Sequence, residues 1–235
     1  MINDNAQSKV NVFSGHINMV STKEPEFPTL MISNGETYHS IHGSQQESLH
    51  VFIHKGLLDF YQQFSPKKVT IIEMGFGTGL NAMNAFINRL PGLIIHYLAI
   101  EKFPLPSEIS HQLPYFKGNK KWRDTFLQLH AIKNGETITL AENFYFTMFY
   151  EDILTFDIPE HADIVFYDAF SFRTQPELWT KEIFEKFFQL MHTPSFLVTY
   201  ACRGIIRKNM TAAGFKVEKL PGPKGKREML RAIKT

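Results

Sequence analysis

KVTIIEMGFGTGLN, residues 68–81, joins an apolar run to a glycine-rich segment. A continuous apolar run of this length is typical of a strand that is buried on both faces. Gly75, Gly77 and Gly79 then occupy every second position before an apolar segment with helical character. Glycine allows positive φ angles and lets a ligand approach the backbone closely, and the first turn of a helix offers unpaired N–H groups. We therefore predict a strand, a ligand-binding loop and a helix in succession.

The spacing of these glycines limits the class of ligand. The pattern is Gly-x-Gly-x-Gly rather than the Gly-x-Gly-x-x-Gly of dinucleotide-binding folds, and no Gly-Lys-Ser/Thr follows that would hold a nucleoside triphosphate. Glu73 stands two residues before the first glycine and is expected at the strand end, inside the ligand crevice. The alternative is a purely structural turn, but three glycines after an acidic residue favour a ligand loop.

Strands and helices alternate along the rest of the chain. Further strands are predicted at 93–101, 162–170 and 195–202, and a terminal pair of strands at 215–220 and 227–234. Residues 137–152 are predicted to form a hairpin, or a single strand with the segment that leads into it. Helices are predicted at 80–90, within 106–129, at 176–191 and at 204–214. This alternation predicts an α/β, doubly wound fold whose mainly parallel sheet is covered on both faces, with an antiparallel C-terminal hairpin at one edge.

The N-terminal part has a different pattern. Residues 1–25 are polar and are expected to form a loose arm or an edge hairpin, and PTLMIS and ETYHSI flank the turn signal Asn34-Gly35, which predicts two short strands. Residues 44–64 place apolar side chains at helical spacing. We predict an arm and an α+β lid over residues 1–64 and a sheet domain over residues 65–235, joined in one compact unit.

Composition and charge exclude several classes of protein. The chain has 235 residues, of which 43% are hydrophobic and 20% charged, so a disordered chain is excluded. It has no apolar run long enough to span a membrane and no secretory signal, which leads us to expect a soluble cytoplasmic protein. Residues 203–235 carry ten lysines and arginines against two glutamates, a net charge of +8, which leaves −6 for residues 1–202. Such a basic segment attracts a polyanion, or it forms a solvated edge hairpin.

Acidic residues follow two of the predicted strands. Glu101 ends the strand after the glycine loop, where a carboxylate can accept both hydroxyls of a ribose. Asp152 follows the apolar run at 144–150 and can accept a hydrogen bond from an adenine amino group, although Glu151 can serve instead. Carboxylates without a phosphate-binding group favour S-adenosylmethionine as the adenosine-bearing ligand.

Asp168 ends the next predicted strand and is followed by Ala-Phe-Ser. Ligands of open α/β sheets bind at such strand ends, and a carboxylate there can hold an amine that is to be methylated. Methyltransferases that act on the amines of bases have an Asp/Asn-Pro-Pro-aromatic motif at the same point. A cap on the following turn is the alternative role.

The histidines of the N-terminal unit and the single cysteine are also candidates for a chemical role. Four histidines gather in the N-terminal unit, but no cysteine or HExxH-type motif accompanies them, and we therefore expect no metal site. The single cysteine, Cys202, excludes an internal disulfide and is expected to be a small core residue rather than a nucleophile.

Five stretches, taken together, resemble the methyltransferase domain of the MnmC family, in its stand-alone form MnmD. The likeness covers roughly residues 27–233 and includes Glu47 and His50 in a Glu-Ser-x-His/Tyr-Val-Phe signature. The five stretches are residues 28–57, EMGFGTGLN at 73–81, AIEKFPL at 99–105, DAFSFRTQPELWTKEIF at 168–184 and PGPKGKREMLRA at 221–232. The chain departs from the family in having Phe172 in place of a common proline and Gln175 in place of an asparagine.

The resemblance implies methylation of 5-aminomethyl-(2-thio)uridine at the tRNA wobble position by S-adenosylmethionine. Asp168 would orient the amine, and a base turned out of its stack would enter the pocket. The FAD-dependent oxidase domain that follows the family's methyltransferase domain is expected to be absent, with another enzyme supplying the aminomethyl group. The candidate pocket walls are Tyr167, Phe170, Phe172 and Trp179, and the candidate phosphate contacts are Lys224, Lys226, Arg227 and Arg231.

Three other functions are compatible with the motifs. One is methylation of another amine, on a nucleic-acid base or a protein, and a second is transfer of an aminopropyl group from a decarboxylated cofactor. The third is an RNA-binding module with a vestigial cofactor pocket, against which the intact glycine loop argues, together with Glu101 and Asp168. The sequence leaves the oligomeric state and the choice of tRNA open.

Overall fold

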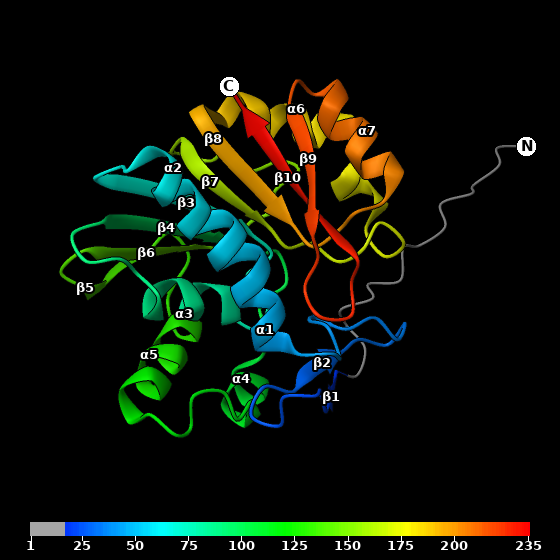
Figure 1. The fold of residues 1–235 in the computed structure, drawn as a ribbon. Helices are drawn as coiled ribbons and strands as arrows, with labels where there is room; N and C mark the ends of the chain where they lie inside the picture. Colours follow the sequence, from blue (N-terminus) through cyan, green and yellow to red (C-terminus); the bar gives the residue numbers. More distant parts are fainter. Residues whose placement is uncertain (1–16) are drawn as a thin grey trace, which may run out of the picture.

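The computed structural model describes residues 17–235, and its centre is an eight-stranded sheet (Figure 1). The strand order is β5-β6-β4-β3-β7-β8-β10-β9. The bounds are β3 Lys68–Met74, β4 Ile94–Ile100, β5 Thr137–Ala141, β6 Phe144–Phe149, β7 Ala162–Tyr167, β8 Met191–Thr199, β9 Lys216–Pro221 and β10 Glu228–Lys234. Strands β6, β4, β3, β7 and β8 are parallel, and antiparallel strands flank them at both edges. The predicted α/β sheet with its C-terminal antiparallel hairpin is confirmed.

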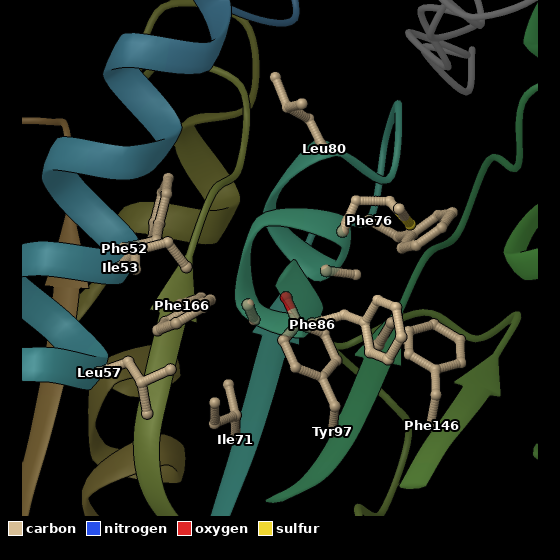
Figure 2. Packing of buried hydrophobic residues seen from close by; sticks show 14 of the residues in the cluster. Phe52, Ile53, Leu57, Ile71, Phe76, Leu80, Phe86, Tyr97, Phe146 and Phe166 are labelled. Atoms are coloured by element: carbon tan, nitrogen blue, oxygen red, sulfur yellow. The ribbon is translucent and has the colours of Figure 1, made fainter. Parts of the chain in front are cut away.

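Helices cover both faces of the sheet. Successive residues of a strand point to opposite faces, so Ile71 of β3 belongs to one hydrophobic cluster and Ile72 to the other. Figure 2 shows Ile71 near Tyr97 and Phe166, on the face that the N-terminal helical segment covers. The same cluster includes side chains of α3 (Leu80–Ile87) and α5 (Lys120–His130), whereas α6 (Lys181–Leu190) and α7 (Gly204–Ala212) pack on the opposite face.

Residues 44–64 form the predicted helix, with an altered middle. The segment consists of α1 (Ser44–Ser48), a π-helix η1 (Leu49–Leu58) and α2 (Asp59–Phe64). Gly56 lets the segment approach the sheet, because a Cβ there would lie 3.0 Å from the Phe166 ring and 3.1 Å from Val198. Phe52 and Leu57 are fully buried in the same cluster as β3 (Figure 2), so this segment and the sheet share one core.

The predicted N-terminal hairpin is corrected by the structure. β2 (Thr29–Met31) pairs antiparallel with β1 (Asn18–Val20), and segment 36–41 forms a single bridge, Met31 to Thr37, instead of a strand. The turn at Asn34-Gly35 is present, but the N–H of His39 donates to the Thr29 side chain at 2.8 Å, which ends the ladder. The arm predicted over residues 1–25 lies outside the described residues up to residue 16, and part of its remainder is β1.

The remaining elements follow the predicted order with one interruption. The helix predicted over residues 176–191 consists of a 3-10 turn, η2 (Pro176–Trp179), and α6, because Thr180 between them is extended. Helix α4 (Ser107–Gln112) and α5 account for the polar segment after β4. None of the helices within residues 17–235 combines the length and the apolar character that a membrane span requires.

Candidate active site

A cavity of about 870 Å³ opens at the carboxyl ends of the central strands. Its floor includes Gly75 after β3, Glu101 after β4 and Asp168 after β7, which is the position where parallel α/β sheets bind ligands. Segment 36–41 and Lys226 complete the walls. Among the described residues, seven acidic residues and two lysines line the cavity, so its electrostatic character favours cationic ligands.

The glycine loop lies directly against the end of β7. Gly75 has a φ of 90°, and a Cβ at this position would lie 2.5 Å from the carbonyl oxygen of Asp168. Any side chain would therefore push the loop away from β7. Gly77 also lines the cavity, whereas Gly79 begins α3 and does not belong to the lining.

Glu101 connects the glycine loop to the end of β4. Its Oε2 accepts the N–H of Gly77 at 2.9 Å, and its Oε1 accepts the N–H of Phe103 at 2.7 Å. Burial raises the pKa of Glu101, and these backbone N–H groups oppose that shift. Each oxygen keeps a further lone pair, so the carboxylate that orders the loop can also accept hydrogen bonds from a ligand.

Asp168 is partly buried at the end of β7 and also lines the cavity. Its Oδ2 accepts a hydrogen bond from the Asn81 amide at 2.7 Å. Burial raises the pKa of Asp168 to about 7, and the nearby charge of Glu47 adds to the shift, while Asn81 and Lys226 oppose it. The sheet thus presents, in one cavity, a carboxyl group that titrates near neutral pH.

An ion pair between two distant parts of the chain stands beside Asp168. Lys226, in the β9–β10 turn, pairs with Glu47 of α1, and its Nζ lies 4.0 Å from the centre of the Tyr200 ring. The hydroxyl of Tyr200 donates to the carbonyl of Ala169 at 2.9 Å. These contacts fix the α1 end and the β9–β10 turn over the cavity.

A second connection is made by Glu36, which is not among the predicted site residues. Its Oε1 accepts the N–H of Ser171 at 2.6 Å, and its Oε2 accepts the hydroxyl of Thr174. The N-terminal turn is thereby tied to the loop after β7. Next to it, the rings of Tyr38 and Phe170 are 4.9 Å apart and nearly perpendicular, and both residues line the cavity.

Comparison with known proteins identifies the family of this chain. A family of S-adenosyl-L-methionine-dependent methyltransferases matches residues 117–235. The chain belongs to this family. Among curated proteins, it is 30% identical over 207 residues to the tRNA 5-methylaminomethyl-2-thiouridine biosynthesis bifunctional protein MnmC of Methylobacillus flagellatus, with 83% of this chain and 32% of that protein covered. The corresponding Chromobacterium violaceum protein is 30% identical over 213 residues, covering 83% of this chain and 31% of that protein.

Solved structures agree with this assignment. The crystal structure of MNMC2 from Aquifex aeolicus superposes with a TM-score of 0.74 at 25% identity, covering 93% of this chain and 70% of that one. Spermidine synthase from Thermotoga maritima has a TM-score of 0.56 at 11% identity, with 93% and 69% covered, and thus shares the fold. The methyltransferase described here spans about a third of the length of the curated relatives it matches.

Two of the predicted cofactor contacts occupy different surroundings. Asp152 lines the cavity together with Glu151, but its Oδ2 already pairs with Lys102 at 2.6 Å, and its Oδ1 accepts the N–H of Leu154 at 3.0 Å. Glu73 is fully buried and does not line the cavity, which corrects its predicted position. Burial raises the pKa of Glu73, and hydrogen bonding with Tyr97 of β4 and with Asn81 in the first turn of α3 opposes that shift.

Three of the four predicted pocket walls do not belong to the cavity lining. Only Phe170 belongs to the lining. Tyr167 is fully buried in the core under α6 and donates to the carbonyl of Leu178, and Trp179 is equally buried with its Nε1 donating to the carbonyl of Phe170 at 2.8 Å. Phe172 instead packs under the Arg203 guanidinium, 5.6 Å from the ring centre. Tyr38 is one of the aromatic lining residues that the sequence did not reveal, because no spacing rule connects it to β7.

The predicted phosphate contacts divide into two pairs. Lys224 and Arg227 are exposed in the β9–β10 turn. Lys226 is engaged by Glu47 within the cavity wall, and the side chain of Arg231 is only 13% exposed, with ion pairs of 2.9 Å to Asp59 and 3.0 Å to Glu218. Neither Lys226 nor Arg231 is therefore presented to a phosphate on the surface.

The histidines and the cysteine also have defined positions. His39 is buried, and its Nε2 lies 2.6 Å from the hydroxyl of Thr78 in the glycine loop, while His50 contacts the carbonyl of Pro221. Within the described part of the chain, no three His, Cys, Asp or Glu side chains are grouped to hold a metal ion. Cys202 is exposed just after β8, and its predicted place in the core is corrected.

Proposed function

We propose that this methyltransferase adds a methyl group to the 5-aminomethyl group of (2-thio)uridine at the wobble position of tRNA, giving the 5-methylaminomethyl form. The observation that carries the proposal is the partly buried carboxyl group of Asp168, placed beside Gly75 in an acidic cavity. The names of the curated relatives, which refer to 5-methylaminomethyl-2-thiouridine in tRNA, support the choice of acceptor. With a tRNA substrate, we expect the protein to act in the cytoplasm.

The residues of the cavity fit S-adenosylmethionine. Gly75 and Gly77 let the loop backbone pack closely against Asp168 and Tyr38 beside the cavity, and Glu101 has lone pairs free for the ribose hydroxyls. Asp152 or Glu151 is positioned at the same cavity for the adenine amino group. When bound, this cofactor supplies an electrophilic methyl group on a positively charged sulfur, and a cavity rich in carboxylates suits that charge.

Asp168 has two tasks in the proposed reaction. An alkyl ammonium ion cannot attack a methyl carbon until it has lost a proton, and a carboxylate is the natural partner for binding and orienting it. The neutral amine would then receive the methyl group that S-adenosylmethionine supplies, and Asp168 would orient the nitrogen and accept the proton that it gives up. Because the pKa of Asp168 is raised to about 7, its carboxylate is a better proton acceptor than an ordinary aspartate. Orientation of the amine remains its main contribution.

The aromatic residues of the cavity form a surface against which the uracil ring can pack. Tyr38 and Phe170 form a corner between the N-terminal unit and the loop after β7. A wobble base that leaves its stack can pack against these rings while its aminomethyl arm reaches Asp168. Glu36 holds the two sides of this corner together through Ser171 and Thr174.

Nucleoside mass spectrometry tests the proposal. The protein and S-adenosylmethionine are incubated with tRNA that carries 5-aminomethyl-2-thiouridine, and unmodified tRNA is the control. We expect a mass gain of one methyl group in that nucleoside alone. No gain in a protein that binds S-adenosylmethionine would overturn the acceptor, and a gain in unmodified tRNA would assign the activity to a different base.

A further inference from the structure

Five exposed cations of the C-terminal third lie at the start of α7, on α7 or in the β9–β10 turn. We call this group the basic face and define it as Arg203, Arg207, Lys208, Lys224 and Arg227, all of which are exposed. Helix α7 lies beside β9, and the β9–β10 turn reaches towards α1 (Figure 1). The backbone N–H of Lys224 donates to the side chain of Gln46 at 3.1 Å, so the turn is anchored to the N-terminal unit.

The charges of the basic face are available to an outside partner. Helix α7 buries Ile206 and Met210, which directs Arg207 and Lys208 outward. The two glutamates of this region are already engaged by other cations, Glu218 by Arg231 at 3.0 Å and Glu228 by Lys219 at 2.8 Å. Within residues 17–235, none of the five cations of the basic face forms an ion pair.

The basic face is continuous with the rim of the cavity. At one end, the Arg203 guanidinium lies over Phe172, next to Ser171 in the cavity wall. At the other end, Arg227 follows Lys226, which lines the cavity. Arg207 and Lys208 of α7 line a shallow pocket together with Val217 of β9, the strand that leads into the β9–β10 turn. The helix and the turn are therefore joined through β9.

We propose that the basic face binds the phosphate backbone of the RNA substrate and sets the direction from which the RNA approaches the cavity. This inference rests on the proposed function. The acidic cavity repels phosphate and attracts a cationic amine, whereas the basic face attracts phosphate through release of condensed counterions. Because the acidic cavity and the basic face lie next to each other, the RNA is oriented with its phosphates on the basic face and its aminomethyl group towards the cavity. Arg231 and Lys226 take no part in this contact because their charges are engaged inside the protein.

The test is the salt dependence of tRNA binding in the double variant Arg207→Gln/Lys208→Gln. The full chain is used, with tRNA carrying 5-aminomethyl-2-thiouridine as the probe. Loss of two phosphate contacts should lower the slope of log K against log salt by about 1.5 and weaken binding roughly tenfold near physiological salt. Affinity for S-adenosylmethionine should stay at the wild-type value, because neither residue lines the cavity.

The matched control is Lys120→Gln/Lys121→Gln, which removes the same charge from exposed positions on α5. We expect this control to keep the wild-type slope. A wild-type slope in the α7 variant, or an equal loss in the control, would overturn the basic face as the RNA contact. If the α7 variant loses RNA affinity as expected while the wild-type protein makes no methylated nucleoside, the basic face stands and the proposed acceptor fails.

Discussion

At the scale of single residues, the proposed chemistry depends on the surroundings of Asp168. Its position after an apolar strand was predictable from the sequence, because ligand-binding residues of α/β sheets stand at such ends. Its pKa was not predictable, because the charges that act on it, Glu47 and Lys226, come from the first helix and the last turn. The same limit applies to Tyr38, whose role emerges only when the N-terminal unit folds over the cavity.

Replacement of Asp168 by asparagine should stabilise the protein in a pH-dependent way. The folded-state pKa of about 7 lies above the ordinary value of 3.8, so ionisation costs folding free energy as pH rises from about 4 to 7 and the cost is constant above that. The stability advantage of Asp168→Asn should therefore grow by about 2 kcal/mol between pH 5.5 and pH 8.5. Urea unfolding at the two pH values measures it, with the exposed Asp157→Asn as control. An advantage that does not change with pH would contradict this description of Asp168.

Substitutions in the neighbouring ion pair should move the pH profile in opposite directions. The charge of Glu47 raises the pKa of Asp168 and that of Lys226 lowers it, after the dominant effect of burial. We expect kcat/KM to rise with pH as Asp168 ionises, with a midpoint that shifts to lower pH in Glu47→Gln and to higher pH in Lys226→Met. Shifts in the same direction, or none, would mean that the pair has a structural role alone.

At the scale of elements, hydrophobic periodicity predicted the strands and helices of the sheet well. Long apolar runs such as 68–74 and 162–167 are predicted as central strands, because only a strand covered on both faces buries all of their side chains. The strand prediction was wrong where a side chain replaces a backbone hydrogen-bond partner. The Thr29 hydroxyl accepts the N–H of His39, and no strand forms over 36–41. Three predicted pocket walls were misplaced for a related reason. Position relative to Asp168 in the sequence does not show which side of the loop a ring occupies.

The contact between the glycine loop and β7 can be tested by Gly75→Ala. Both Gly75 and Gly92 have positive φ angles, but a Cβ on Gly92 meets nothing within 4 Å, whereas one on Gly75 meets Asp168 at 2.5 Å. Gly92→Ala should cost about 1 kcal/mol of stability through backbone strain alone. Gly75→Ala should cost roughly 2 kcal/mol more and weaken S-adenosylmethionine binding at least about tenfold, as measured by unfolding and calorimetry. Equal effects of the two substitutions would show that the close approach is unimportant.

At the scale of the whole molecule, acidic and basic regions are separated. The cavity collects carboxylates from the N-terminal unit and from three strand ends, and the C-terminal third exposes its cations outside it. The sequence predicted this division of charge along the chain, with −6 before residue 203 and +8 after it. It did not predict that Lys226 and Arg231 would be used internally, because their partners Glu47 and Asp59 are distant in the chain.

The cofactor should stabilise the folded protein by mass action. With S-adenosylmethionine at a hundredfold excess over its Kd, we expect about 2.7 kcal/mol of added stability, seen as a rise in Tm. NAD is the matched control, because the glycine spacing lacks the dinucleotide pattern. Stabilisation by NAD and not by S-adenosylmethionine would contradict the description of the glycine loop.

The most direct test of the central claim compares single-turnover methylation by wild-type protein and Asp168→Asn. Both are given saturating S-adenosylmethionine and tRNA that carries 5-aminomethyl-2-thiouridine, and cofactor affinity is measured in parallel. We predict that Asp168→Asn loses at least about a hundredfold in rate, because general acid–base and orienting groups contribute on this scale, while its affinity for S-adenosylmethionine stays within about twofold of wild type. A wild-type rate in this variant would contradict the assignment of Asp168 as the residue that orients the amine.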